Sequence, residues 1–265
     1  MKMHIAGVCL DIEGVLLQEG RALPGAAEAV EATRAAGLPL RCLTNTTTTA
    51  RAVVLARLNE AGIGVDKAEV LTPAAGAAGF LETQGITRVH LAAAPELARD
   101  FASFDLCDTD AGAVVMGDLH RGFDWDRLNG LYRMLDAGAV LIALHKNRYC
   151  RRGAENGLDL GPFVAALEYA SGQMARVFGK PSGDFFASAV GGMGLEADKV
   201  VMVGDDIEAD IGGALAAGLK AVQVRTGKYT PRDEEEGRPV PDARIASIAD
   251  LPALLDLSSR QLTGR

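Results

Sequence analysis

The sequence predicts an α/β protein built on a doubly wound parallel sheet. Short apolar runs alternate with helical patterns over most of the chain, which is typical of parallel strands covered by helices on both faces. Four polar motifs stand directly after apolar runs or directly before helices, where open parallel sheets bind their ligands. The 265 residues, of which 48% are apolar and 23% charged, are enough for one large or two modest domains with a well-buried core.

The first elements follow from apolar spacing and from glycine stops. Residues 5–10 are expected to form a buried strand, and a helix begins near Pro24 and Gly25 and stops at Gly37. Its buried face would hold Ala26, Ala29, Val30 and Thr33. Residues 38–43 form the next strand. Residues 50–61 form the next helix, with Val53, Val54, Arg57 and Leu58 at helical spacing.

The middle of the chain, residues 72–177, reads as a second α/β unit. Its expected strands are Arg88–Ala92, Ala113–Met116 and residues 139–144. Asp124 is the expected N-cap of a helix that Gly138 closes, with Leu128, Leu131, Tyr132 and Leu135 along it. Residues 151–161 (RRGAENGLDLG) read as a polar, glycine-rich loop. Strands at 200–203 and 221–224, with a helix at 209–217 between them, return the chain to the first sheet.

Composition excludes several classes of protein. A net charge of −8 argues against a general nucleic-acid binder, which needs a basic face. The four cysteines are far apart and predict neither a metal knuckle nor a disulfide framework; Cys9 and Cys42 read as buried thiols. No apolar run reaches the length of a membrane span, and the N-terminus lacks a signal peptide, so a cytoplasmic location is expected. The charged run at 232–238 reads as a solvated loop.

The first two motifs follow the first two expected strands. Asp11 and Glu13 are two residues apart, so one carboxylate can act as nucleophile and the other as acid or base, with oxygen ligands for Mg²⁺. Thr44 and Asn45 open the run TNTTTT, whose hydroxyl, amide and backbone N–H groups suit phosphate oxygens at the start of a helix. Each motif alone is explained at least as well by helix capping or by solvated acids.

The other two motifs lie in the C-terminal third. Pro181 restricts Lys180 to extended conformations just before a helix that begins near Gly183, and an ammonium there can neutralise phosphate charge. Asp205, Asp206 and Asp210 follow a very apolar strand, and clustered acids repel unless a cation lies among them. Helix capping explains some of these acids, but four acids at 205–210 exceed what a cap requires. Together the four motifs supply the parts for Mg²⁺-assisted phosphoryl transfer.

The ordered set resembles the four motifs of the haloacid dehalogenase-like (HAD) superfamily, and other stretches are similar to its NagD-like subfamily IIA. Those stretches are LTNTT at 43–47, ALHKNRY at 143–149, GPFV at 161–164, ALEYA at 166–170 and TGKY at 226–229. The resemblance implies a Rossmann-like core of residues 1–72 and 178–265 with an α/β type C2 cap, residues 73–177, inserted between the second and third motifs. A receiver domain would present its motifs in the reverse order, and a dinucleotide fold needs a glycine fingerprint directly after a strand, whereas the glycines at 191–194 follow a helix.

The resemblance also implies a role for each motif residue in a Mg²⁺-dependent phosphatase that acts on a small phosphorylated metabolite or pyrophosphate. Asp11 would be the nucleophile, forming an aspartyl-phosphate, and a metal ligand, and residue 13 would give the metal its backbone carbonyl. Thr44, Asn45 and Lys180 would hold the transferring phosphoryl group. Asp205 would ligate Mg²⁺ directly, with Asp206 or Asp210 in support.

Glu13 departs from the family pattern, in which an aspartate usually stands two residues after the nucleophile and the nearest relatives have serine. Glutamate keeps the acid/base chemistry, but its extra methylene moves the carboxyl group by about 1.5 Å. A misplacement of that size can cost roughly 100-fold in rate. The sequence therefore predicts a working but slow enzyme. The alternative is a catalytically impaired, phosphate-sensing or scaffolding protein.

The expected cap has a basic segment, with Lys146, Arg148, Arg151 and Arg152 in an otherwise acidic chain. In the family this part of the cap approaches the active site, so Lys146 and Arg148 are candidate contacts for a second anionic group of the substrate or for pyrophosphate. A solvated loop with rim ion pairs explains the same residues equally well. An exposed cap strand that pairs across a two-fold axis would give a homodimer.

Overall fold

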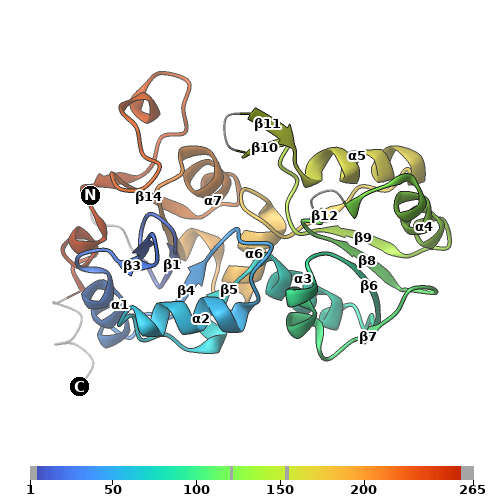
Figure 1. Cartoon of the computed structure of the whole chain (residues 1–265). Helices are drawn as coiled ribbons and strands as arrows, with labels where there is room; N and C mark the ends of the chain where they lie inside the picture. The colour runs from blue at the N-terminus through green and yellow to red at the C-terminus, as the bar shows by residue number, and fades with distance from the viewer. Residues whose placement is uncertain (1–4, 120–121, 153–154, 258–265) are drawn as a thin grey trace. The chain divides into compact units, whose positions relative to one another are not determined.

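The computed structural model describes residues 5–119, 122–152 and 155–257, and the chain divides into two compact units. The core unit comprises Met1–Thr44, Ala52–Leu71 and Lys180–Arg265, and the inserted unit comprises Asn45–Arg51 and Thr72–Gly179. Both units are parallel α/β structures (Figure 1).

The core unit is built on a six-stranded parallel sheet with the order β15-β14-β13-β1-β4-β5. Its strands are β1 (Gly7–Asp11), β4 (Leu40–Leu43), β5 (Val70–Leu71), β13 (Val200–Gly204), β14 (Lys220–Val224) and β15 (Ala243–Ile245). A small hairpin of β2 (Leu17–Gln18) and β3 (Arg21–Ala22) follows β1. Because β1 pairs with both β4 and β13, strands from the two ends of the sequence are neighbours at the centre of the sheet.

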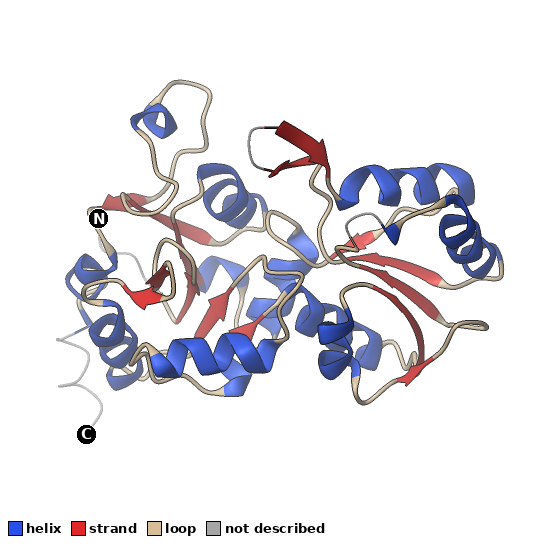
Figure 2. Ribbon diagram, in the orientation of Figure 1, coloured by secondary structure: helices blue, strands red, loops and turns tan. Residues whose placement is uncertain are grey.

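The helices of the core unit lie between these strands along the chain or, for the last helix, after them (Figure 2). They are α1 (Ala26–Ala35), α2 (Arg51–Glu60), α6 (Gly183–Gly191), α7 (Gly213–Ala216) and α8 (Leu251–Leu254), and a π-helical turn, Ile207–Gly212, leads into α7. Short 3₁₀ turns lie at Lys67–Glu69, Ala197–Lys199, Pro231–Glu234 and Ile248–Asp250. The helix α1 starts after Gly25 and is followed by Gly37, as expected, and the positive φ of Gly37 is typical of the residue that ends a helix.

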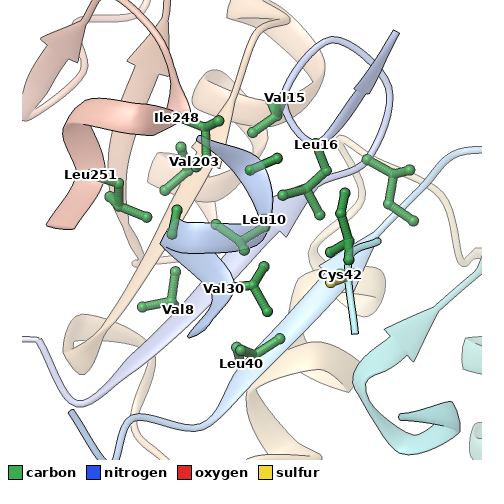
Figure 3. Packing of buried hydrophobic residues seen from close by; sticks show 14 of the residues in the cluster. Val8, Leu10, Val15, Leu16, Val30, Leu40, Cys42, Val203, Ile248 and Leu251 are labelled. Atoms are coloured by element: carbon green, nitrogen blue, oxygen red, sulfur yellow. The ribbon is translucent and has the colours of Figure 1, made fainter. Parts of the chain in front are cut away.

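Alternate residues of the central strands form the hydrophobic core of this unit. Val8 and Leu10 of β1 pack with Val203 of β13 and with Val30 of α1 (Figure 3). Side chains alternate along a strand, so Cys9 faces the other side of the sheet, and it too is fully buried. Both faces of the sheet are therefore covered, which confirms the doubly wound architecture. The predicted burial of Cys9 and Cys42 is also confirmed.

The inserted unit has a five-stranded parallel sheet with the order β12-β9-β8-β6-β7. Its strands are β6 (Arg88–Ala92), β7 (Asp105–Leu106), β8 (Ala113–Met116), β9 (Val140–Ala143) and β12 (Arg176–Val177). Its helices are α3 (Pro73–Thr83), a 3₁₀ segment Pro95–Phe101, α4 (Trp125–Asp136) and α5 (Leu160–Ser171). The α3 side and the α4–α5 side have separate apolar clusters, so helices cover both faces of this sheet as well.

Three expected elements differ from the structure. Residues 151–161 are not a loop, because β10 (Tyr149–Arg152) pairs antiparallel with β11 (Glu155–Leu158) and α5 already begins at Leu160. The expected helix 209–217 begins instead as the π-helical turn at Ile207. The threonine run after Asn45 does not open a helix directly, since α2 starts at Arg51, and only Val54 and Leu58 of its expected face are buried. Within the described residues, none of the helices is long and apolar enough to cross a membrane.

Candidate active site

The candidate active site lies at the carboxyl end of the core sheet. Asp11 is the last residue of β1, Thr44 directly follows β4, and Asp205 directly follows β13. These three strands are adjacent and parallel, so their carboxyl ends lie at the same edge. The sheet order therefore brings together residues that are far apart in the sequence.

Three carboxylates converge at this edge. One oxygen from each of Asp11, Asp205 and Asp210 lies within 4.8 Å of the others, and these residues are the one such cluster of metal-ligating side chains in the described part of the chain. The three residues are only 6%, 2% and 1% exposed. Buried like charges at this separation repel strongly unless a positive charge lies among them.

The π-helical turn and a glycine bring Asp210 into the cluster. A Cβ atom at Gly204 would lie 2.2 Å from the Cβ of Asp210, so only glycine at the end of β13 allows this approach. The backbone N–H of Asp206 donates to Asp210 Oδ2 at 3.2 Å. The carboxylate of Asp206 itself caps the turn, accepting from the N–H groups of Glu208 and Ala209. Asp206 is therefore not part of the cluster, whereas Asp210 is.

Lys180 is the positive charge that the sequence motif predicts among these acids. Its buried ammonium pairs with Asp11 and lies 2.6 Å from Asp210 Oδ1. Burial disfavours the charged form, but the carboxylates of Asp11 and Asp210 outweigh it and raise the pKa of Lys180 above its usual value. The next residue, Pro181, packs against α7, because Gly213 has no side chain to keep it away. Lys180 is thus a permanent cation beside Asp11.

One lysine does not neutralise three carboxylates, and two negative charges remain in excess. Burial and the charge of Asp210 raise the pKa of Asp11, and burial likewise raises the pKa of Asp205. Oδ2 of Asp205 accepts a hydrogen bond from the backbone N–H of Lys228 at 2.7 Å, whereas Oδ1 is buried and has no hydrogen-bond partner among the described residues. An unpartnered buried carboxylate oxygen, excess negative charge and all-oxygen ligands fit a hard divalent cation such as Mg²⁺.

The remaining motif residues differ in where the structure places them. Glu13 is exposed and follows Asp11 in a tight turn, in which the N–H groups of Leu16 and Leu17 donate to the carbonyl of Ile12. Thr44 is buried in the core unit, and its N–H donates to Leu71 at the end of β5. Asn45 belongs to the inserted unit. There its Oδ1 would lie 3.4 Å from a Cβ at Gly179, the residue before Lys180.

The candidate residues of the basic segment lie in the inserted unit and differ from one another. The Lys146 ammonium pairs with both carboxylate oxygens of Glu168, at 2.6 and 2.8 Å. Arg148 is exposed, and its guanidinium forms no ion pair with any described residue. His145, which stands between β9 and Lys146 in the sequence, is buried, and its Nε2 lies 3.6 Å from the carboxylate of Asp159. Arg148 therefore presents an unneutralised charge, whereas Lys146 does not. The side chains of Arg151 and Arg152 lie outside the described residues.

Sequence reasoning assigned no role to the turn after β14, although its residues lie against the acids. Thr226 donates from Oγ1 to the carbonyl of Gly14 at 2.5 Å, and Lys228 contacts Asp205 through its backbone. The stretch TGKY at 226–229 contributed to the family resemblance but was given no role in the site, because neither a threonine nor a backbone N–H identifies a catalytic residue. The signal in the sequence was Gly227, which follows the end of a buried strand by three residues.

Comparisons with known proteins find similar sequences over most of the chain. Residues 8–107 match a family model described as haloacid dehalogenase-like hydrolase, and residues 177–251 match one described as HAD-hydrolase-like. The chain is 37% identical over 257 residues to human phospholysine phosphohistidine inorganic pyrophosphate phosphatase, covering 95% of this chain and 94% of that protein. It is 39% identical over 237 residues to human haloacid dehalogenase-like hydrolase domain-containing protein 2, covering 89% and 90%.

Two solved structures extend the likeness to the fold. The p-nitrophenyl phosphatase from Archaeoglobus fulgidus superposes with a TM-score of 0.82 at 26% identity, covering 93% of this chain and 98% of that chain. A glycerol phosphate phosphatase from Mycobacterium tuberculosis, solved in complex with magnesium, gives a TM-score of 0.74 at 26% identity, covering 94% and 76%.

Proposed function

The chain belongs to the haloacid dehalogenase-like hydrolases and is a phosphatase of that family, and from this premise we propose its reaction and its metal. We propose that it hydrolyses a small phosphorylated substrate, or pyrophosphate, in a Mg²⁺-dependent reaction that passes through an aspartyl-phosphate on Asp11. The observation that carries the proposal is the convergence of three buried carboxylates on one buried lysine, with Asp205 Oδ1 left unpartnered.

The proposed metal ligands are the carboxylates of Asp11, Asp205 and Asp210 and the backbone carbonyl of Glu13. The excess negative charge of the cluster would otherwise repel a phosphate dianion. Bound Mg²⁺ would supply the positive charge that lets an anionic substrate approach an anionic nucleophile. A phosphatase of this fold has been solved with magnesium, which supports the choice of cation.

In the proposed reaction, a carboxylate oxygen of Asp11 forms a bond to phosphorus while the bond from phosphorus to the leaving oxygen breaks. Glu13 would protonate that oxygen, and the same carboxylate would then take a proton from the water that hydrolyses the acyl phosphate and regenerates Asp11. Thr44 and Asn45 would hold the phosphoryl oxygens. Lys180 would neutralise charge on the transferring group, because its pKa keeps it protonated.

The substrate proposal rests on the relatives and on the inserted unit. Similarity to a protein named for pyrophosphate and phosphoamino-acid hydrolysis favours a small, strongly anionic substrate. Arg148 is the described basic candidate whose charge is free to meet a second anionic group, whereas Lys146 is neutralised by Glu168. A homodimer and a cytoplasmic location remain predictions from the sequence; sedimentation analysis of the purified protein tests the first.

The test is turnover of p-nitrophenyl phosphate, glycerol phosphate and pyrophosphate with Mg²⁺ and with EDTA. We expect Mg²⁺-dependent hydrolysis that Asp11→Asn lowers by at least about 10³-fold. The matched control is Asp198→Asn, an exposed acid of the same unit whose one ion pair with a described residue is to Lys199, and it should retain full activity. Borohydride trapping should reduce the acyl phosphate at residue 11 to homoserine, which mass spectrometry of the digested protein detects.

Binding of a phosphate mimic and Mg²⁺ without turnover of any substrate in the panel would instead support the impaired, phosphate-sensing alternative that Glu13 raises. Turnover that Asp11→Asn leaves intact would refute the proposed nucleophile.

A further inference from the structure

The turn Thr226–Lys228 returns from the end of β14 to the acidic cluster, although 21 residues separate Thr226 from Asp205. Two hydrogen bonds connect this turn to the site. The backbone N–H of Lys228 donates to Asp205 Oδ2 at 2.7 Å, and the hydroxyl of Thr226 donates to the carbonyl of Gly14 at 2.5 Å. The turn therefore contacts both a proposed metal carboxylate and the loop that directly follows Asp11.

Two glycines enclose the Asp205 carboxylate. A Cβ at Gly227 would lie 2.0 Å from Asp205 Oδ2 and 2.7 Å from the Cα of Gly14. A Cβ at Gly14 would lie 2.2 Å from the same oxygen. Both glycines have positive φ, +61° and +86°, which side chains rarely adopt. The carboxylate thus occupies a narrow slot between Gly14 and Gly227, and a side chain at either position would close the slot.

This slot gives the two oxygens of Asp205 different roles. Oδ2 lies between the glycines and accepts the Lys228 N–H, so its position is fixed. Oδ1 is the buried oxygen without a hydrogen-bond partner in the described structure. A carboxylate whose one oxygen is held by the protein presents the other in a single orientation, which is how the surroundings of a metal site fix its ligands.

Side chains of the core unit hold the turn in place. Gln223 of β14 is fully buried, and its amide donates to Asp233 Oδ2 at 2.8 Å, which fixes the segment on the far side of the turn. Arg244 of β15 donates to Gln223 Oε1 at 3.0 Å and to the carbonyl of Asp233 at 3.1 Å. The ammonium of Lys228 adds an ion pair of 3.0 Å with Asp206. The turn is therefore anchored at both ends before it reaches Asp205.

We propose that the turn Thr226–Lys228 is a positioning element for the metal site: Gly227 and the Lys228 N–H orient the Asp205 carboxylate, and Thr226 fixes the loop that carries the Glu13 carbonyl. The proposal rests on the proposed function, since it takes Asp205 as a ligand of Mg²⁺. None of the three residues touches the substrate or the reacting atoms in this scheme; they act through Asp205 and through the loop at Gly14.

The experiment measures Mg²⁺ binding to the full-length, substrate-free protein by calorimetry, with Mn²⁺ paramagnetic resonance as a second readout. The test variants are Gly227→Ala and Thr226→Val. Gly227→Ala should weaken Mg²⁺ binding by about 10- to 100-fold, the usual effect of losing an outer contact to a metal ligand. Thr226→Val should weaken it by about 3- to 10-fold, because it removes one hydrogen bond to the neighbouring loop.

Matched controls separate positioning from a general loss of stability. Gly194→Ala introduces the same kind of strain at φ +67°, but a Cβ there has nothing within 4 Å. Thr33→Val removes a buried hydroxyl that donates to the carbonyl of Ala29 at 2.7 Å, in the same unit but within α1. Both controls should keep the wild-type affinity for Mg²⁺. Thr33→Val should lower the unfolding temperature about as much as Thr226→Val, whereas Gly194→Ala reproduces the backbone strain of Gly227→Ala without its close contacts.

The outcomes distinguish the two proposals. Wild-type protein that binds no divalent cation would overturn the proposed function and with it the role of the turn. Suppose that the wild type binds Mg²⁺ and that Asp205→Asn abolishes this binding. If Thr226→Val and Gly227→Ala then bind Mg²⁺ as tightly as the wild type, the positioning role alone is overturned. If Gly227→Ala does not fold, an unchanged affinity in Thr226→Val still refutes the inference, and a weakened affinity that Thr33→Val lacks supports it.

Discussion

The variant Asp205→Asn should make the protein more stable than the wild type without divalent cations and less stable than the wild type with them. Asp205 is almost fully buried among like charges, and its own Oδ1 has no partner within the described residues. An asparagine keeps an oxygen that can accept the Lys228 N–H and places an amide donor where that unpartnered acceptor now lies. The substitution removes the negative charge of residue 205, which is useful only when a metal ion is bound.

The size of the effect follows from the separation of the acids. Oxygens of Asp11, Asp205 and Asp210 lie within 4.8 Å of one another. At that distance two like charges repel by about 3.5 kcal/mol at an effective dielectric constant of about 20. Asp205 has two such neighbours, and Lys180 offsets part of the repulsion because it pairs with both of them. We therefore expect the metal-free variant to gain about 1–3 kcal/mol of unfolding free energy.

The assay is urea unfolding at pH 7.5 in EDTA and in Mg²⁺. At a Mg²⁺ concentration about 100 times its dissociation constant, the wild type should gain about 2.7 kcal/mol, whereas the variant should gain little. The order of stability should thus reverse between the two conditions. A variant that is less stable than the wild type in EDTA, or an equal response of both proteins to Mg²⁺, would refute the reasoning.

Three further predictions concern single residues. Glu13→Asp should raise kcat by about 10-fold or more by returning the carboxyl group to the family's position, and an unchanged or lower kcat would contradict the misplacement argument. Arg148→Ala should raise KM for pyrophosphate more than for p-nitrophenyl phosphate. Lys146→Ala should mainly lower the stability of the inserted unit by about 1–3 kcal/mol, because Glu168 loses its ion pair and keeps only the hydrogen bond from the Ala175 N–H. Equal KM effects of both variants would remove the distinction. Burial lowers the pKa of His145 from its usual 6.5, so the unfolded chain takes up the proton first as the pH falls. The stability of the inserted unit should be full above pH 6.5 and fall below it, and His145→Gln should flatten this dependence in urea titrations.

The sequence predicted the longer parallel strands and the meeting of distant motif residues, because both depend on simple patterns, but it did not predict the short strands β5, β7, β12 and β15. The strands β6 and β8 have the predicted bounds, since a short run of buried apolar residues has few alternatives to a strand. The pairing of β1 with β4 follows from the order of the chain, whereas its pairing with β13 joins the two ends of the sequence, as the family resemblance implied. Asp11, Lys180 and Asp210 accordingly meet at one edge of the sheet.

The features that sequence reasoning missed depend on the backbone or on pairing partners. The hairpin β10–β11 is polar and contains glycine, so its residues lack the apolar alternation that identifies a strand. The π-helical turn at Ile207 begins where Asp206 caps backbone N–H groups, and no side-chain period reveals a register of that kind. The hydrogen bond from Lys228 to Asp205 uses a main-chain donor, which every residue except proline possesses.

The position of β1 between β4 and β13 has a consequence for how a newly made chain folds. Once β1 and β4 have left the ribosome, β1 lacks its second hydrogen-bonding partner until about 160 more residues have been synthesised. Residues 72–179, made in that interval, contain a complete sheet with its own two apolar clusters and can fold first. During that interval the N-terminal strands have an unpaired edge that is prone to aggregation. A chain truncated before β13 should therefore bind holding chaperones and should not be an active enzyme.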